Sequence, residues 1–252
     1  MVRNFDIRVK PEEWLPTDID GCKLWLRSDY AYQDAAKAVP CTADSLIWTG
    51  EDKSGEINDF IQATEAKRFV YKTNQLDGYS AWLADIVDDY MSRTVADLLN
   101  VFSANQGSLI IIAKHDSTSE VDRGFDTTGN RFGLWLPYAG NIYFDFGDST
   151  DGRVVTAVPA GWQNTYQMNI FYRRTDGTQV IRTAGVDRVS ATRTAQIPST
   201  AGALYLSSTS TPYAVWKGYY VEIIGYSVGL TDADITNLEN YVKSRYPSVV
   251  FD

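Results

Sequence analysis

Hydrophobic and polar residues alternate along most of the chain in short runs separated by turn residues. Residues 142–146 alternate in this way, and residues 107–115 form an apolar run typical of a strand buried on both faces. Ala139-Gly140 and Asp176-Gly177 stand between such runs and predict hairpin turns. About ten short strands with this spacing predict an all-β fold, an antiparallel sandwich or jelly roll.

Two segments have helical rather than alternating spacing. The first is a short helix predicted near 92–102, and the second is a C-terminal helix predicted over 231–246. Thr231 and Asp234 form a capping box at the start of the second, and Pro247 ends it. Its apolar stripe is Ile235, Leu238, Tyr241 and Val242. This stripe predicts a helix that covers a core.

Residues 1–20 differ from the rest, because they contain two prolines and no helical period. They predict an extended N-terminal arm in front of a domain over residues 21–252. Such an arm packs either on its own domain or on a neighbouring subunit. Its isolated apolar side chains are candidates for anchoring or for an oligomer contact: Phe5, Ile7, Val9, Trp14 and Leu15.

The net charge of −9 argues against general nucleic-acid binding, which needs a basic surface. No stretch approaches eighteen consecutive apolar residues, so no membrane span is expected, and the first residues lack the apolar region of a secretory signal. We therefore expect the protein either to stay in the cytoplasm where it is made or to leave by another route, such as inside a virus particle released by lysis. Arg and Lys concentrate over residues 153–217, which indicates either a docking face or the solvated face of a sheet.

Two cysteines, Cys22 and Cys41, and one histidine are too few for a four-ligand zinc site. A Cys22–Cys41 bridge would stabilise the fold by about 3 kcal/mol. Two packed, reduced thiols are the alternative, and the sequence leaves both open.

Four fragments in order resemble the concanavalin A-like, laminin-G-like β-sandwich modules of phage virion and bacterial surface proteins. They are Leu24–Arg27, then Trp48 with Asp52–Gly55 and Asn58, then Ala84–Met91, and finally Glu222–Asp232. The resemblance covers roughly residues 22–247, and the inserted pair Gly50-Glu51 departs from it. It implies a jelly-roll sandwich in which Trp48 is a core residue, Lys53-Ser54-Gly55 is a turn, and Asn58-Asp59 bonds to local backbone.

Glycoside hydrolases that resemble this sandwich carry Glu-x-Asp-x-x-Glu on one strand, and this chain lacks that spacing. Its nearest acidic cluster is Asp145, Asp148 and Asp151, which suits a polar hairpin end better than a catalytic pair. We therefore expect no enzyme activity; a glycoside hydrolase or a polysaccharide lyase is the less favoured alternative. The resemblance allows calcium at this cluster, or at Asp85, Asp88 and Asp89, and no other cofactor is expected.

Aromatic side chains in predicted loops could stack on sugar rings. These carbohydrate-binding candidates are Trp135, Tyr138, Trp162, Tyr213 and Trp216. The favoured hypothesis is a phage virion component (capsid decoration, fibre or tail) held by its arm, assembled with itself as a trimer or with other virion proteins, and binding host polysaccharide. The alternative is a stand-alone, lectin-like module.

Overall fold

The last strand of the chain, β16 (Lys217–Tyr226), lies in the middle of one sheet, between β1 (Cys22–Tyr32) and β7 (Gly107–His115). This first sheet continues through β12 (Tyr166–Arg173), β13 (Thr178–Thr183) and β14 (Val186–Thr192). The computed structural model describes residues 14–85, 87–93, 100–116, 121–127, 132–198, 202–207 and 215–252. Every strand pairing in it is antiparallel apart from two isolated bridges, which confirms the predicted all-β sandwich.

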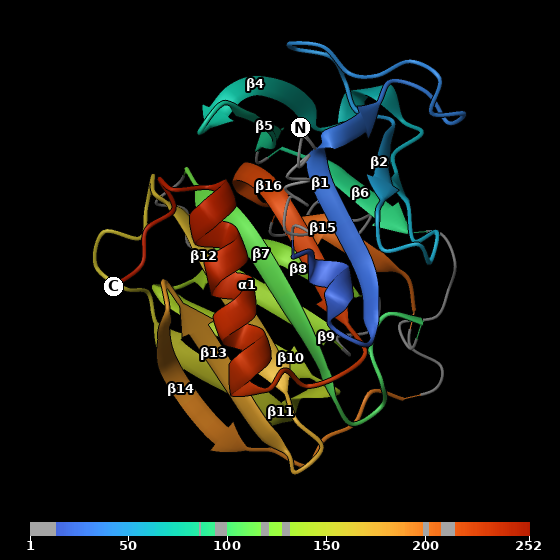
Figure 1. The fold of residues 1–252 in the computed structure, drawn as a ribbon. Helices are drawn as coiled ribbons and strands as arrows, with labels where there is room; N and C mark the ends of the chain where they lie inside the picture. Colours follow the sequence, from blue (N-terminus) through green and yellow to red (C-terminus); the bar gives the residue numbers. More distant parts are fainter. Residues whose placement is uncertain are drawn as a thin grey trace, which may run out of the picture.

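A second sheet packs against the first (Figure 1). Its strands are β6 (Tyr90–Arg93), β15 (Leu204–Ser207), β8 (Val121–Thr127), β9 (Phe132–Tyr138), β10 (Asn141–Phe146) and β11 (Asp148–Ala157). Two short strands, β2 (Thr49–Asp52) and β3 (Phe60–Ile61), carry the hydrogen-bonded path from β1 to β6. A hairpin of β4 (Val70–Leu76) and β5 (Tyr79–Asp85) joins β16, and the 3-10 helices are η1 (Pro16–Asp18) and η2 (Glu65–Lys67).

Strand β7 is buried on both faces, as its apolar run predicts. Leu109 and Ile111 point into the main core between the sheets, whereas Ile110 and Ile112 point into a second core on the other face. Because side chains alternate along a strand, one continuous apolar run serves two cores.

The second core is covered by the single α-helix that the described residues contain, α1 (Asp232–Arg245), which lies in front of the first sheet in Figure 1. Thr231 caps it, since its hydroxyl accepts the Asp234 N–H at 3.2 Å and the Asp234 carboxylate accepts the Thr231 N–H at 2.9 Å. The predicted capping box and lid are thus confirmed. No helix within the described ranges has both the length and the apolar character needed to cross a bilayer.

The helix predicted near 92–102 is wrong at its start. Ser92 and Arg93 end β6, where they pair with Tyr205 and Leu204 of β15, so the sheet ladder takes these residues. Residues 94–99 of that prediction lie outside the described part.

The described end of the N-terminal segment packs on its own domain. The Trp14 ring lies 6.0 Å from the ring of Tyr241 in α1, and Leu15 packs against the same core. Pro16–Asp18 form a 3-10 turn, so this part is not extended as predicted. Phe5, Ile7 and Val9 lie outside the described residues.

Asp52 organises the loop that the sequence resemblance singled out. Its carboxylate accepts the N–H groups of Trp25, Ser54 and Asn58 at 2.8–2.9 Å, and Asp59 accepts the Asp52 N–H at 2.8 Å. This motif is therefore scaffold, as predicted. Trp48 is not the core residue expected, because it is only half-buried and lies 4.2 Å beneath the Arg68 guanidinium.

Both cysteines are free thiols. Burial raises the pKa of Cys22 and of Cys41 to about 12, so both stay protonated at neutral pH.

Candidate functional site

Four adjacent strands of the second sheet, β8 to β11, present large side chains on the face that points away from the main core. In β9, Leu134 and Leu136 point into that core, whereas Trp135 and Tyr138 do not. Tyr143 of β10 pairs directly with Trp135, and so lies beside it on the same outer face.

The β9–β10 turn fixes how these rings meet. Ala139 and Gly140 both have positive φ, 47° and 74°, which is the backbone of a tight type I′ hairpin. The Tyr138 ring consequently lies 5.2 Å from Trp135 and 5.8 Å from Tyr143, tilted by 58° and 68°. The three rings and Arg153 line a hollow of about 180 Å³, which we call the aromatic hollow.

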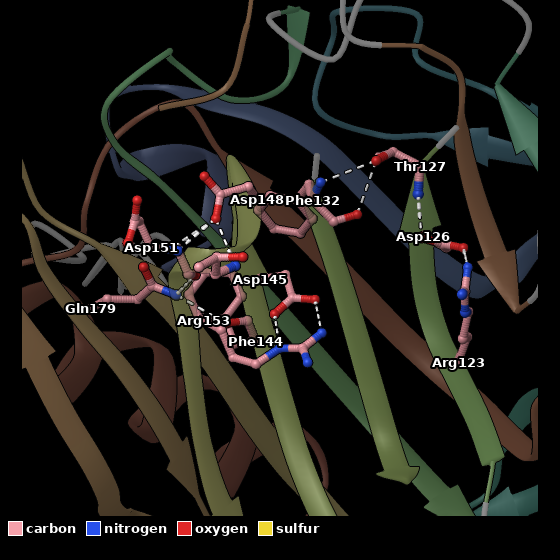
Figure 2. Close-up of polar contacts among 12 residues, drawn as sticks. Arg123, Asp126, Thr127, Phe132, Phe144, Asp145, Asp148, Asp151, Arg153 and Gln179 are labelled. Atoms are coloured by element: carbon pink, nitrogen blue, oxygen red, sulfur yellow. Dashed lines mark hydrogen bonds and ion pairs between the residues drawn. The ribbon is translucent and has the colours of Figure 1, made fainter. Parts of the chain in front are cut away.

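Arg153 of β11 closes one side of the hollow and is held by Asp145 of β10 (Figure 2). Its Nε and Nη2 atoms each lie 2.6 Å from one carboxylate oxygen of Asp145, a two-pronged ion pair. The guanidinium lies 5.0 Å from the centre of the Tyr143 ring. The Arg153 side chain is 34% exposed and that of Asp145 only 5%, so the carboxylate lies beneath the cation.

A second Arg–Asp pair flanks the hollow on β8. The Arg123 guanidinium lies 4.0 Å from the centre of the Trp135 ring, and it donates to the carboxylate of Asp126 (Figure 2). Gly133 of β9 lies between the Arg153–Asp145 and Arg123–Asp126 pairs. A Cβ atom built on Gly133 would contact only Asp126, at an ordinary van der Waals distance of 3.6 Å.

Burial raises the pKa of both Asp126 and Asp145, and the neighbouring arginines oppose this effect. Each carboxylate is committed to its own guanidinium. The arrangement therefore suits positioning of a ligand by stacking and hydrogen bonds rather than proton transfer.

Of the five aromatic side chains predicted to contact sugar, the structure brings Trp135 and Tyr138 together at the hollow. Trp162 and Trp216 do lie outside the strands, but they are only 4% and 1% exposed, so the prediction that they contact sugar is wrong. Their rings pack against the buried His115, 5.3 and 5.1 Å away, and His115 in turn contacts the buried Asp122. Tyr213 lies outside the described residues.

The acidic cluster does not assemble as a set of calcium ligands. Asp145 pairs with Arg153, whereas Asp148 accepts the backbone N–H groups of Thr150 and Asp151, both at 2.7 Å. Asp151 is exposed. In the part of the chain that the structure describes, which includes Asp85, Asp88 and Asp89, no three potential ligands are placed to hold a metal ion.

Three residues of the site escaped the sequence interpretation: Arg123, Tyr143 and Arg153. Tyr143 had a signal, because it alternates with the core residues Ile142 and Phe144 and must therefore point outward with Trp135. Arg153 belongs to the basic stretch 153–217, but no signal in the sequence placed either arginine beside these rings, since their positions depend on strand register.

No protein-family model and no curated protein sequence matches the chain. Solved structures do. Domain 4 of AbnA, a GH43 extracellular arabinanase from Geobacillus stearothermophilus, in complex with arabinotriose, has a TM-score of 0.59 at 14% identity, over 86% of this chain and 98% of that one.

Two toxin domains are similar over about half of their own length. The binding domain of Paraclostridial Mosquitocidal Protein 1 has a TM-score of 0.60 at 8% identity, over 91% of this chain and 53% of that one. The botulinum neurotoxin serotype D ligand binding domain, in complex with N-acetylneuraminic acid, has a TM-score of 0.58 at 12% identity, over 88% and 51%. At such identities the likeness shows a shared β-sandwich fold, and it is not specific to phage.

Proposed function

We propose that this chain is a non-catalytic carbohydrate-binding module whose ligand lies in the aromatic hollow. The observation that carries the proposal is the cluster of Trp135, Tyr138 and Tyr143 beside the partly exposed Arg153. Aromatic rings stack on the C–H faces of sugars, while a fixed guanidinium donates to their oxygens. Two of the similar β-sandwich domains were solved with saccharides, arabinotriose and N-acetylneuraminic acid, which supports this choice.

We favour binding over catalysis because the carboxylates beside the hollow are buried and paired with arginine. Asp126 and Asp145, which flank the hollow, are each almost fully buried and paired with arginine. A glycoside hydrolase needs one carboxyl group free to give a proton and another free to attack or to activate water.

The test is a glycan array probed with the intact chain, followed by titration of each hit while the intrinsic tryptophan fluorescence is measured. We expect binding to a restricted set of glycans, with a fluorescence change that disappears in Trp135→Phe. Binding to no glycan, or a signal that survives in Trp135→Phe and disappears in a Trp48→Phe control, would contradict the proposal.

The virion setting stays a prediction of the sequence resemblance, and so does the trimer. Trp14 and Leu15 pack on the chain's own second core, so we assign the proposed partner contact of the N-terminal arm to residues 1–13. Light scattering of the full chain and of a chain that begins at Trp14 tests this. An oligomer that becomes a folded monomer supports assembly through these residues, whereas a monomer in both cases contradicts it.

A further inference from the structure

The positive charges of the two arginines beside the aromatic hollow are each balanced by a neighbouring aspartate of the protein. Arg153 is neutralised by both oxygens of Asp145, and Arg123 is paired with Asp126. The chain as a whole carries a net charge of −9. An anionic ligand would therefore lose hydration here without meeting a surplus positive charge.

The hollow nevertheless contains hydrogen-bond donors for the uncharged oxygens of a ligand. The bonds to Asp145 use Nε and Nη2 of Arg153, so Nη1 and its two N–H groups lie outside that pair. The hydroxyls of Tyr138 and Tyr143 can both donate and accept. These groups match the hydroxyl and ring oxygens of an uncharged sugar.

The size of the hollow limits how much of a glycan it holds. Its volume of about 180 Å³ is below the about 300–1,000 Å³ of pockets that enclose drug-sized ligands. The rings are tilted by 58° and 68° instead of being coplanar, so they surround one sugar ring rather than offering a flat track for several.

We propose that the aromatic hollow selects a neutral sugar and holds one ring of it, with Arg153 Nη1 as the donor that orients the ring. This inference rests on the proposed carbohydrate-binding function and names the ligand class.

The experiment titrates the full chain, followed by NMR, with matched pairs that differ only at C6: glucose and glucuronate, galactose and galacturonate, mannose and mannuronate, as oligosaccharides of one to four rings. In at least one pair we expect the neutral member to bind about tenfold more tightly than its uronate. Its affinity should change less than about twofold between low and high salt, since no net charge is bound. The affinity of the neutral sugar should gain little beyond one ring.

Asp145→Asn tests the charge argument directly, because it leaves Arg153 with an unbalanced positive charge. We expect the preference for the neutral member to fall by about tenfold. Asp126→Asn, which unbalances Arg123, serves as a second variant if the first is unstable, and thermal unfolding checks both.

The outcomes separate the two proposals. Tighter binding of uronates by the unmodified chain, an unchanged preference in both folded variants, or affinity that rises tenfold with each added ring would overturn this inference and leave carbohydrate binding standing. Binding to neither member of any pair, together with an empty glycan array, would overturn both.

Discussion

Asp145 and Arg153 face one another across β10 and β11 with both oxygens of the acid engaged, and the buried acid lies beneath a cation that is one-third exposed. The pair therefore connects the buried part of the second sheet, through Asp145, with the aromatic hollow, through Arg153. Its geometry depends on the fork of the guanidinium, which an ammonium group cannot reproduce.

Arg153→Lys should weaken carbohydrate binding by about tenfold and lower the free energy of unfolding by about 1–3 kcal/mol, because one oxygen of a buried carboxylate loses its partner. Calorimetric titration and urea denaturation measure the two effects. Arg188→Lys is the matched control, since Arg188 pairs with the half-exposed Asp252, and its loss should stay below about 1 kcal/mol. Equal effects of the two substitutions would contradict this role for Arg153.

Tyr138→Ala should reduce carbohydrate binding by about tenfold or more and change stability by less than about 1 kcal/mol, because the residue is 39% exposed. Tyr219→Ala is the control. That tyrosine lies beside Lys114 in the first sheet, remote from the hollow, and the variant should bind normally. The reverse result would place the binding surface on the first sheet.

Glu222 should make stability depend on pH. Its fully buried carboxylate accepts hydrogen bonds from Tyr241 and Tyr246 at 2.8 and 2.6 Å and from the Trp25 indole, and so joins α1 to the sheet. Burial raises its pKa above the usual 4.5, and these donors oppose the rise. The folded state therefore holds the proton longer than the unfolded chain, so this group's contribution to stability falls as pH rises from 4.5 to the folded pKa.

Glu222→Gln should remove that part of the pH dependence, and denaturant midpoints measured across the acid range test it. Glu222→Ala should lower the free energy of unfolding by about 3 kcal/mol or more, since three buried donors lose their acceptor. An unchanged pH profile in Glu222→Gln would show that other carboxyl groups set it.

Asp89 gives a second, separable contribution. Burial, followed by the charge of Asp85, raises its pKa from 3.8 to about 7. Stability from this group is fully present below pH 3.8 and is lost as pH rises toward 7, with a slope of at most about 1.4 kcal/mol per pH unit. NMR titration of the Asp89 carboxyl checks the pKa, and Asp89→Asn should flatten the slope. A midpoint below pH 5 would contradict the expectation.

Ile57→Gly should stabilise the protein by about 1 kcal/mol, although it removes a hydrophobic side chain. Ile57 has φ of +57° and is 79% exposed, so a β-branched residue occupies the left-handed region and buries little surface. Val39→Gly is the control: Val39 is also exposed but has no positive φ, so glycine there should cost about 0.5–1 kcal/mol. Thermal unfolding of both variants measures the two effects, and a lower melting temperature for Ile57→Gly would contradict the prediction.

Local signals in the sequence predicted the local features of the fold. Thr231 and Asp234 mark the helix start, and Ala139-Gly140 marks the hairpin, because each depends on a few consecutive residues. Ser92 was placed in a helix because apolar spacing there competes with a strand pairing to β15, which lies over a hundred residues later in the chain.

The site was only partly predictable for the same reason. Trp135 and Trp216 are alike in the sequence, but one stands on the outer face and the other fills the main core. The Asp145–Arg153 and Arg123–Trp135 contacts arise from register between strands, which no local pattern encodes.

The position of β16 has a consequence for the order of events during synthesis. This strand separates β1 from β7, although the chain makes it some two hundred residues after β1. Until residue 226 leaves the ribosome, β1 has no partner on that side and the second core has no helix to cover it. The first sheet must therefore wait, partly assembled, until β16 and α1 have been made, and a slow, late folding step is built into this topology.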